Sequence, residues 1–241
     1  MQLLRSLLFN IIMIATAVVA ATIAVFTFPL PPLVRYSIVC RWGRLMTWLV
    51  ARLCGIRYRV EGREHLPRKQ TAILFSNHQS SWETLAFQQI FPPQVWVLKR
   101  ELLWVPFFGW GLAMLEPIAI NRGAGRNAVR QIVEQGRARL ESGRWVVVFP
   151  EGTRVSPGHH KRFGVGGAVL AAETGHPVVP VAHNAGVFWP RRGFLKKPGV
   201  IRVVIGPTIH THGKSAEEIN REAEHWIRAA MDKIGREGDA S

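Results

Sequence analysis

Apolar and polar residues form two different patterns along the chain, with a change near residue 55. The first pattern is an apolar segment, Leu7 to Phe28, that carries no charged residue. At about 1.5 Å per residue, a helix of this length covers the roughly 30 Å hydrocarbon core of a bilayer. A cleaved signal peptide is one alternative, although the apolar run continues well past the Ala15-Thr16-Ala17 cleavage site. A helix that dips into one leaflet is another.

A basic amphipathic helix is predicted from Val34 to Leu53. At about 100° per residue, Arg41, Arg44 and Arg52 fall within an arc of about 80°, and apolar residues fill the neighbouring arc. Such a helix suits a membrane interface, or it packs its apolar side on the domain. We therefore expect an N-terminal membrane-associated unit, residues 1–54. Positive charge is denser after the apolar run than before it, which predicts that the bulk of the chain lies on the cytoplasmic side of the membrane.

Short apolar runs separated by helical patterns follow, and they predict one α/β domain over residues 55–241. Alternation of strands and helices indicates a largely parallel central sheet flanked by helices. The last helix is expected to begin at Ser215, where Glu218 completes a capping box, and to end near Gly235. The predicted strands are Ile56–Val60, Ala72–Phe75, Val95–Leu98, Ile118–Ile120, Trp145–Phe149, Val178–Val181 and Val200–Ile205, and the clearest helices between them are Gly125–Glu141 and Gly164–Thr174.

Composition points to an anionic partner. Lys and Arg together number 31 against 16 Asp and Glu, a formal charge of +15, and 48% of the residues are hydrophobic. Such a surface attracts nucleic acid, anionic lipid head groups, or an acidic protein or metabolite, but no zinc-finger, RNP or KH signature is present, so we expect no nucleic-acid partner. The cysteines, Cys40 and Cys54, lack the spacing of a metal or redox site, so we expect no metal.

One polar stretch, Asn77 to Glu83, follows the predicted strand Ala72–Phe75 directly. It sets His78 on the turn that leaves the carboxyl end of a strand, where ligands bind in open α/β sheets. In the simpler interpretation, Glu83 forms a capping box with Ser80 and His78 is a polar loop residue. In the other, His78 is a general base and Glu83 orients its imidazole. A carboxylate has two oxygens, so Glu83 can serve both purposes.

Polar clusters also follow four other predicted strands, and in a mostly parallel sheet all of them gather at one edge. That edge would combine an imidazole, fixed cations and a tight Gly turn, an arrangement that can bind a phosphate while a base takes a proton from a nearby hydroxyl. Each cluster has a simpler explanation by itself: solvated arginines, an ordinary turn at Gly152, and a hydrogen-bonded histidine at the end of a strand. The four clusters are Lys99-Arg100, Asn121-Arg122, Pro150–Arg154 and His183-Asn184.

Four sequence blocks, which include the polar stretches that follow the predicted strands, occur in a characteristic order along the chain. The chain resembles the glycerophospholipid acyltransferase family, and within it the bacterial 1-acyl-sn-glycerol-3-phosphate acyltransferases. One departure is Glu83, where the family usually has Asp; the side chain of Glu is one methylene longer and still reaches an imidazole. The blocks are Asn77–Glu83, Pro117–Arg122, Phe149–Arg154 and Val178–Ala182.

The resemblance implies a role for each block. His78 would deprotonate the acceptor hydroxyl, and Glu83 would orient His78 and stabilise the imidazolium. The Val178–Ala182 block would line the site or the acyl path. No cofactor is implied, because the acyl thioester, acyl-CoA or acyl-ACP, is a co-substrate. The substrate phosphate would be held by Arg122, Glu151, Gly152, Thr153 and Arg154, with Lys99 as a helper.

The expected activity is transfer of a fatty acyl chain to the free sn-2 hydroxyl of 1-acyl-glycerol-3-phosphate, giving phosphatidate at a membrane. Its expected partners are membrane lipid and the acyl donor. One alternative keeps the chemistry and changes the acceptor, for example to a lyso-ornithine lipid, whose carboxylate the arginines would bind. An alternative of another class is a non-catalytic membrane protein that binds anionic lipid through its basic face.

Overall fold

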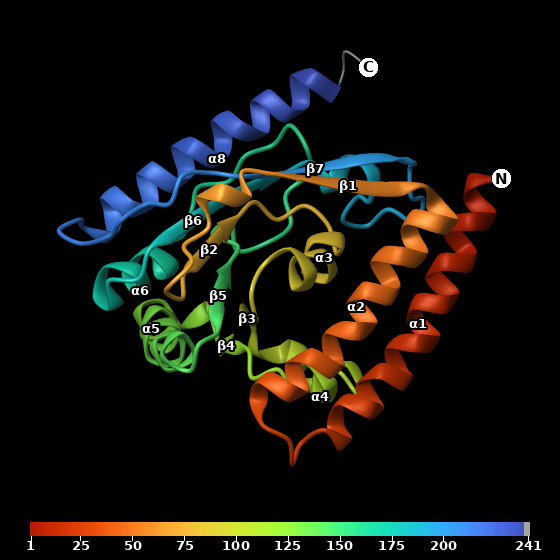
Figure 1. The fold of residues 1–241 in the computed structure, drawn as a ribbon, viewed down its shortest axis with the longest axis horizontal. Coiled ribbons are helices and arrows are strands. Elements are labelled where there is room, and N and C mark those ends of the chain that lie inside the picture. The colour runs from red at the N-terminus through yellow and green to blue at the C-terminus, as the bar shows by residue number, and fades with distance from the viewer. Residues whose placement is uncertain (239–241) are drawn as a thin grey trace.

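A computed structural model describes residues 1–238 of the chain; the last residues of the predicted 55–241 domain, 239–241, lie outside it. The fold is α/β, a seven-stranded sheet flanked by helices (Figure 1). The strands are β1 Ile56–Glu61, β2 Ile73–Ser76, β3 Gln94–Lys99, β4 Ile118–Ile120, β5 Trp145–Val148, β6 Val178–His183 and β7 Gly199–Ile205. The α-helices are α1 Gln2–Phe26, α2 Pro32–Cys54, α3 Trp82–Ile90, α4 Phe108–Ala113, α5 Arg126–Glu141, α6 Gly166–Thr174, α7 Ala185–Phe188 and α8 Ala216–Gly238. Short 3-10 turns are η1 Arg63–His65, η2 Arg100–Trp104 and η3 Arg122–Ala124.

The strand order is β1-β7-β6-β2-β5-β3-β4. Every neighbouring pair is parallel except β6 and β7, which run antiparallel, so the predicted largely parallel sheet is confirmed. β2 lies in the middle, between β6 and β5. Because β2, β5 and β6 run in the same direction, the polar segments that follow them meet at one edge of the sheet.

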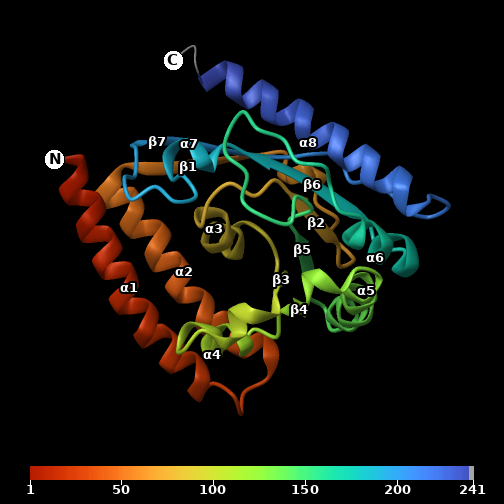
Figure 2. The ribbon, with the colours of Figure 1, turned by 180° about the vertical axis from the view of Figure 1, so that it is seen from behind.

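Helices cover both faces of the sheet (Figures 1 and 2). Successive residues of a strand point to opposite faces, and β2 shows this clearly. Leu74 packs in the core beneath α2 and α3, whereas Ile73 and Phe75 pack in the core formed with α5, α6 and α8. All four residues of β2 are buried, as expected of a strand with helices on both sides.

The N-terminal helices form an antiparallel pair along one side of the molecule (Figure 2). Both predicted helices are present, and α1 is the one helix in the described part of the chain whose length and apolar composition suit a membrane span. The pair packs on the rest of the protein: Phe9, Met46 and Val50 belong to the same core as Leu74. The boundary between α2 and β1 falls at Gly55, and the division into 1–54 and 55–241 stays a prediction.

Several element boundaries differ from those predicted by one or a few residues, and two of these belong to helices with a predicted capping box. The helix after β2 begins at Trp82, with Ser81 rather than Ser80 at its N-cap. The last helix begins as predicted, because the Ser215 backbone N–H donates to Glu218 Oε2 at 2.8 Å and the Glu218 N–H donates to Ser215 Oγ at 3.2 Å. It continues to Gly238, past the predicted end, because a single Gly in a helix weakens it without breaking it. The η2–α4 connection was not predicted.

Candidate active site

His78 and Glu83 form a hydrogen-bonded pair at the carboxyl end of β2. Nδ1 of His78 lies 2.8 Å from Oε1 of Glu83, which also accepts the backbone N–H groups of Gln79 at 2.9 Å and Ser80 at 2.8 Å. Glu83 is fully buried, and its second oxygen has no partner among the described residues. With Nδ1–H donated to the carboxylate, the lone pair of Nε2 is free to accept a proton.

The carboxyl group of Glu83 is held in its charged form. Burial by itself would raise the pKa of Glu83, but the positive charges that His183 and His78 carry when protonated, together with hydrogen bonds from His78 and the Ser80 backbone N–H, outweigh it, so the pKa lies below its usual range. Glu83 also caps α3, as the simpler interpretation held, through its bond to Ser80. The box is only half formed, because Ser80 Oγ accepts the N–H of Trp82, at 3.1 Å, rather than that of Glu83.

The turn after β5 holds His78 from three sides. The ring of Phe149 stacks on the imidazole with centroids 4.1 Å apart and planes inclined by 16°. The His78 backbone N–H donates to Glu151 Oε2, and its carbonyl oxygen accepts the N–H of Val155, both at 2.7 Å. The position and the plane of the imidazole are therefore set by a neighbouring strand.

Glu151 lies differently from the prediction. Its carboxylate is buried against the His78 backbone and is not part of the pocket described below. Burial raises the pKa of Glu151 to about 7, the nearby charge of Glu83 adds to the rise, and the His78 N–H opposes it. The next residue, Gly152, turns the chain with φ +68°, which Gly adopts at little strain.

Two arginines, Arg122 and Arg154, lie close to His78 at the carboxyl edge of the sheet. Arg122, after β4, donates from a guanidinium nitrogen to the carbonyl of Gly152, and Arg154 ends the turn after β5. The Nε of Arg154 is buried without a partner in the described part of the chain. The backbone carbonyl of Arg154 accepts a hydrogen bond from Nη1 of Arg191 at 2.9 Å. Lys99, by contrast, is half-exposed, pairs with Glu101 at 3.2 Å and lies outside the pocket lining.

Asn77 and His183 join the ends of β2 and β6. Nδ2 of Asn77 donates to the His183 carbonyl at 2.9 Å, and its Oδ1 accepts the His183 N–H at 3.0 Å. The ring of His183 pairs with the Asn77 carbonyl through Nε2 at 2.9 Å and accepts the Ala185 N–H through Nδ1 at 3.2 Å. Burial lowers the pKa of His183. His183 is therefore a neutral, fully hydrogen-bonded residue, as its simpler explanation held.

A pocket of about 250 Å³ opens next to this site. His78, Arg122 and Arg154 form its polar end, and the rest of the lining is almost entirely apolar. Sequence reasoning missed this wall, which comes from both N-terminal helices, α3, β3, η2 and α4. The expected Val178–Ala182 block is not part of it, since it lies within the buried strand β6. The apolar lining includes Ala17, Ala20, Ala21, Ala24, Trp42, Leu98, Phe108, Gly111 and Leu112.

Known proteins share both the sequence pattern and the fold. The acyltransferase family model matches residues 57–184. The chain is 46% identical to the 1-acyl-sn-glycerol-3-phosphate acyltransferase of Pseudomonas aeruginosa, over 97% of this chain and 92% of that one. This chain belongs to the acyltransferase family. It is also 31% identical to human 1-acyl-sn-glycerol-3-phosphate acyltransferase alpha, over 80% of this chain and 69% of the human one.

A solved structure has the same fold as this acyltransferase. The crystal structure of the Thermotoga maritima 1-acyl-sn-glycerophosphate acyltransferase, PlsC, superposes with a TM-score of 0.80 at 23% identity, over 97% of this chain and 96% of that chain. The family match contains every residue predicted for the site of this acyltransferase, from His78 to Arg154. The apolar pocket wall supplied by α1 and α2 lies outside that match. Within the described residues, no group of three or more His, Cys, Asp or Glu side chains could hold a metal ion.

Proposed function

We propose that this acyltransferase moves a fatty acyl chain from an acyl thioester to the free sn-2 hydroxyl of 1-acyl-glycerol-3-phosphate, giving phosphatidate. One observation carries the proposal. A single pocket has an imidazole and two guanidinium groups at its polar end and apolar walls beyond them. That combination suits a substrate with a phosphate, a hydroxyl and a long hydrocarbon chain. The names of the Pseudomonas and human relatives support the acceptor, since both are called 1-acyl-sn-glycerol-3-phosphate acyltransferases.

His78 is proposed as the general base. Its Nε2 takes the proton of the acceptor hydroxyl while the oxygen attacks the thioester carbonyl. The tetrahedral intermediate then breaks its C–S bond, and the imidazolium returns the proton to the leaving thiolate, so that an ester and a free thiol result. Buried, ionised Glu83 stabilises the imidazolium between the two steps. General base catalysis supplies about 100- to 10,000-fold, and positioning of the two substrates supplies much of the rest.

Arg122 and Arg154 are proposed to bind the acceptor phosphate, because both line the pocket beside His78. Gly152 and Thr153 stay in the proposed phosphate-binding turn, where Gly152 fixes Arg122 through its carbonyl. Glu151 receives a different role: its carboxylate positions the His78 backbone, and in its ionised form it would repel a phosphate. Lys99 remains a predicted helper at the rim.

We also propose that α1 lies in one leaflet at the cytoplasmic face of the inner membrane. Its first residue, Gln2, donates to the Lys196 carbonyl at 2.7 Å, and Ala21 packs against Gly111 of α4. These contacts are about 28 Å apart along the helix axis, at about 1.5 Å per residue. A helix held at both ends by the same domain cannot cross a bilayer that leaves that domain on one side.

The test is an assay of His78→Ala in detergent or nanodiscs. Thiol release from acyl-CoA and from acyl-ACP is measured with lysophosphatidate as the acceptor. We expect transfer to fall at least about 100-fold, while His160→Ala, a matched change in the exposed loop, keeps the wild-type rate. Near-wild-type transfer by folded His78→Ala protein would end this mechanism.

An acceptor panel tests the substrate. Lysophosphatidate is compared with lyso-ornithine lipid at equal chain length and equal surface concentration. We expect phosphatidate to be the main product, because two guanidinium groups match a phosphate better than a single carboxylate. A higher kcat/KM with lyso-ornithine lipid would show that the proposed acceptor is wrong, while the proposed role of His78 as general base would be unaffected.

A further inference from the structure

The connection between β3 and β4 exposes an unusual concentration of large apolar side chains. We call residues 102–110 the aromatic loop; it covers most of η2 and the start of α4. Trp104 is 69% exposed, Trp110 51% and Phe107 48%. A water-soluble surface rarely gathers so many large apolar groups in one place without a partner. The exposed apolar residues of the loop are Leu102, Trp104, Val105, Phe107, Phe108 and Trp110.

The backbone of the aromatic loop has a defined shape. Phe107 takes a φ of +60°, which a residue with a side chain adopts only when its surroundings hold it there. Gly109 packs so closely that a Cβ would lie 2.4 Å from the carbonyl oxygen of Leu103. The rings of Phe107 and Trp110 touch, with centroids 5.2 Å apart. The loop therefore presents its aromatic rings on a braced turn.

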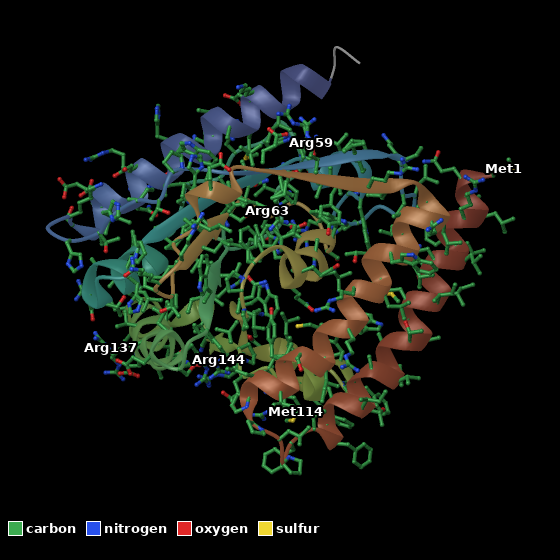
Figure 3. All side chains as sticks on the ribbon, in the orientation of Figure 1. Met1, Arg59, Arg63, Met114, Arg137 and Arg144 are labelled. Carbon is green, nitrogen blue, oxygen red and sulfur yellow. The ribbon has the colours of Figure 1, made fainter. Side chains whose placement is uncertain are left out.

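The aromatic loop continues the apolar surface of α1. At Gly111, directly after the loop, a Cβ would lie 2.8 Å from Cα of Ala21, so α4 and α1 touch without intervening side chains. The outer side of α1 is itself apolar and exposed near this contact, at Val18, Val19 and Ile23; Figure 3 shows side chains projecting outward along this helix. Both figures show α4 against the C-terminal half of α1 (Figures 1 and 2).

The inner side of the same loop forms part of the active-site pocket, through Leu102 and Phe108. Its outward rings, Trp104 and Trp110, are not part of the pocket lining. One short segment thus separates the pocket from the outer apolar surface. Two exposed cations, Lys99 and Arg100, precede the loop; Lys99 pairs with Glu101, which lies between them and the loop, so Arg100 is the cation that anionic head groups would complement.

We propose that the aromatic loop inserts into the same leaflet as α1 and forms the bilayer-side wall of the acyl pocket. The proposal rests on the proposed function for the identity of the lipid that uses the pocket. We assign the bilayer as the partner of this surface, because the surface is continuous with α1, carries two tryptophans of the kind found at membrane interfaces, and is preceded by the exposed Arg100. A second copy of the chain is the other occupant that such a surface admits, and the tests below distinguish them.

The first test measures depth in the bilayer. An environment-sensitive fluorophore is attached to Trp104→Cys; the native Cys40 and Cys54 are buried. The control label sits at Arg130→Cys on α5, where the native side chain is 73% exposed. With vesicles of phosphatidylethanolamine and phosphatidylglycerol, we expect a blue shift and quenching by nitroxides on the lipid chains at position 104 only. Equal responses at both positions, or no quenching at either, would overturn the proposal.

The second test links the loop to substrate access. Transfer is measured with long-chain lysophosphatidate in vesicles and with a short-chain lysophosphatidate dispersed as monomers. For Trp104→Asp we expect the ratio of vesicle rate to monomer rate to fall about tenfold, because a large apolar side chain no longer enters the bilayer. Val200→Asp, at a half-exposed apolar position in β7, should keep the wild-type ratio. An unchanged ratio for Trp104→Asp would count against the loop.

Two further outcomes are separable. If wild-type protein transfers no acyl group to lysophosphatidate, the proposed function is wrong. The fluorescence test still decides whether the aromatic loop inserts into the bilayer. If sedimentation equilibrium in lipid-free detergent shows a dimer that Trp104→Asp dissociates, and the label at position 104 is not quenched by lipid nitroxides, the surface is an interface between two copies and the membrane proposal is overturned.

Discussion

Oε2 of Glu151 lies 2.7 Å from the backbone nitrogen of His78 and accepts its N–H, so a side chain from the turn after β5 holds the residue that follows β2. Glu151 is almost completely buried there, and its pKa is raised to about 7. A carboxyl group with a raised pKa binds a proton more tightly in the folded than in the unfolded state. Between its usual value of 4.5 and about 7, the contribution of Glu151 to stability therefore falls as pH rises.

Glu151→Gln should remove this pH dependence. Gln keeps an oxygen that accepts the His78 N–H and has no charge to bury. The variant should match wild type near pH 4.5 and exceed its free energy of unfolding by up to roughly 3 kcal/mol at pH 8, from about 1.4 kcal/mol per pKa unit. Denaturant unfolding in one detergent at both pH values measures the difference. A gap of the same size at both pH values would show that Glu151 does not titrate in this range.

The Glu83–His78 bond makes a prediction about activity. Glu83→Gln leaves the imidazole without a charged partner, so kcat should fall about 100- to 10,000-fold with little change in the KM of either substrate. Oε1 of Glu83 accepts three hydrogen bonds, and the side chain of Asp is one methylene shorter, so its carboxylate would lie farther from these donors. For Glu83→Asp we expect a smaller loss of kcat than for Glu83→Gln, about 100-fold, as for a misplacement of the carboxylate by about 1 Å. An Asp variant as active as wild type would show that the turn adjusts freely.

The sequence predicted most of the sheet because buried strands of the β2 type are uniform apolar runs bounded by polar turns. It predicted the convergence of His78, Arg122 and Arg154 because parallel strands deliver their following residues to one edge. It did not predict the pocket wall, since the apolar faces of α1 and α4 have the same composition whether they meet lipid, core or substrate. It also did not predict that the Glu151 side chain points toward the His78 backbone instead of the pocket, because a motif specifies which residue occupies a turn but not the orientation of its side chain.

Asn77 should be a structural residue of the site. Its amide makes two hydrogen bonds with the backbone of His183, in a place where both backbone groups are buried. Asn77→Ala leaves a buried N–H and a buried carbonyl unpaired, and each costs about 1–3 kcal/mol. We expect unfolding to become easier by about 2–4 kcal/mol and kcat to fall as His78 loses its fixed position. Thermal unfolding of Asn77→Ala beside Asn127→Ala, an exposed position on α5, measures the stability change.

Arg122 and Arg154 should determine the affinity for the acceptor far more than for the donor. A hydrogen bond between charged groups contributes about 1.5–3 kcal/mol, so Arg154→Ala should raise the KM for lysophosphatidate roughly 10- to 100-fold. Arg122→Ala should do the same, while the KM for acyl-CoA changes little in either variant. Lys in place of Arg154 should restore part of the affinity, because it keeps the charge without the planar fork. Arg130→Ala, on the exposed side of α5, serves as the control for loss of surface charge. Equal increases in the KM for both substrates would assign these arginines to the donor as much as to the phosphate, and the orientation proposed for the acceptor would then be wrong.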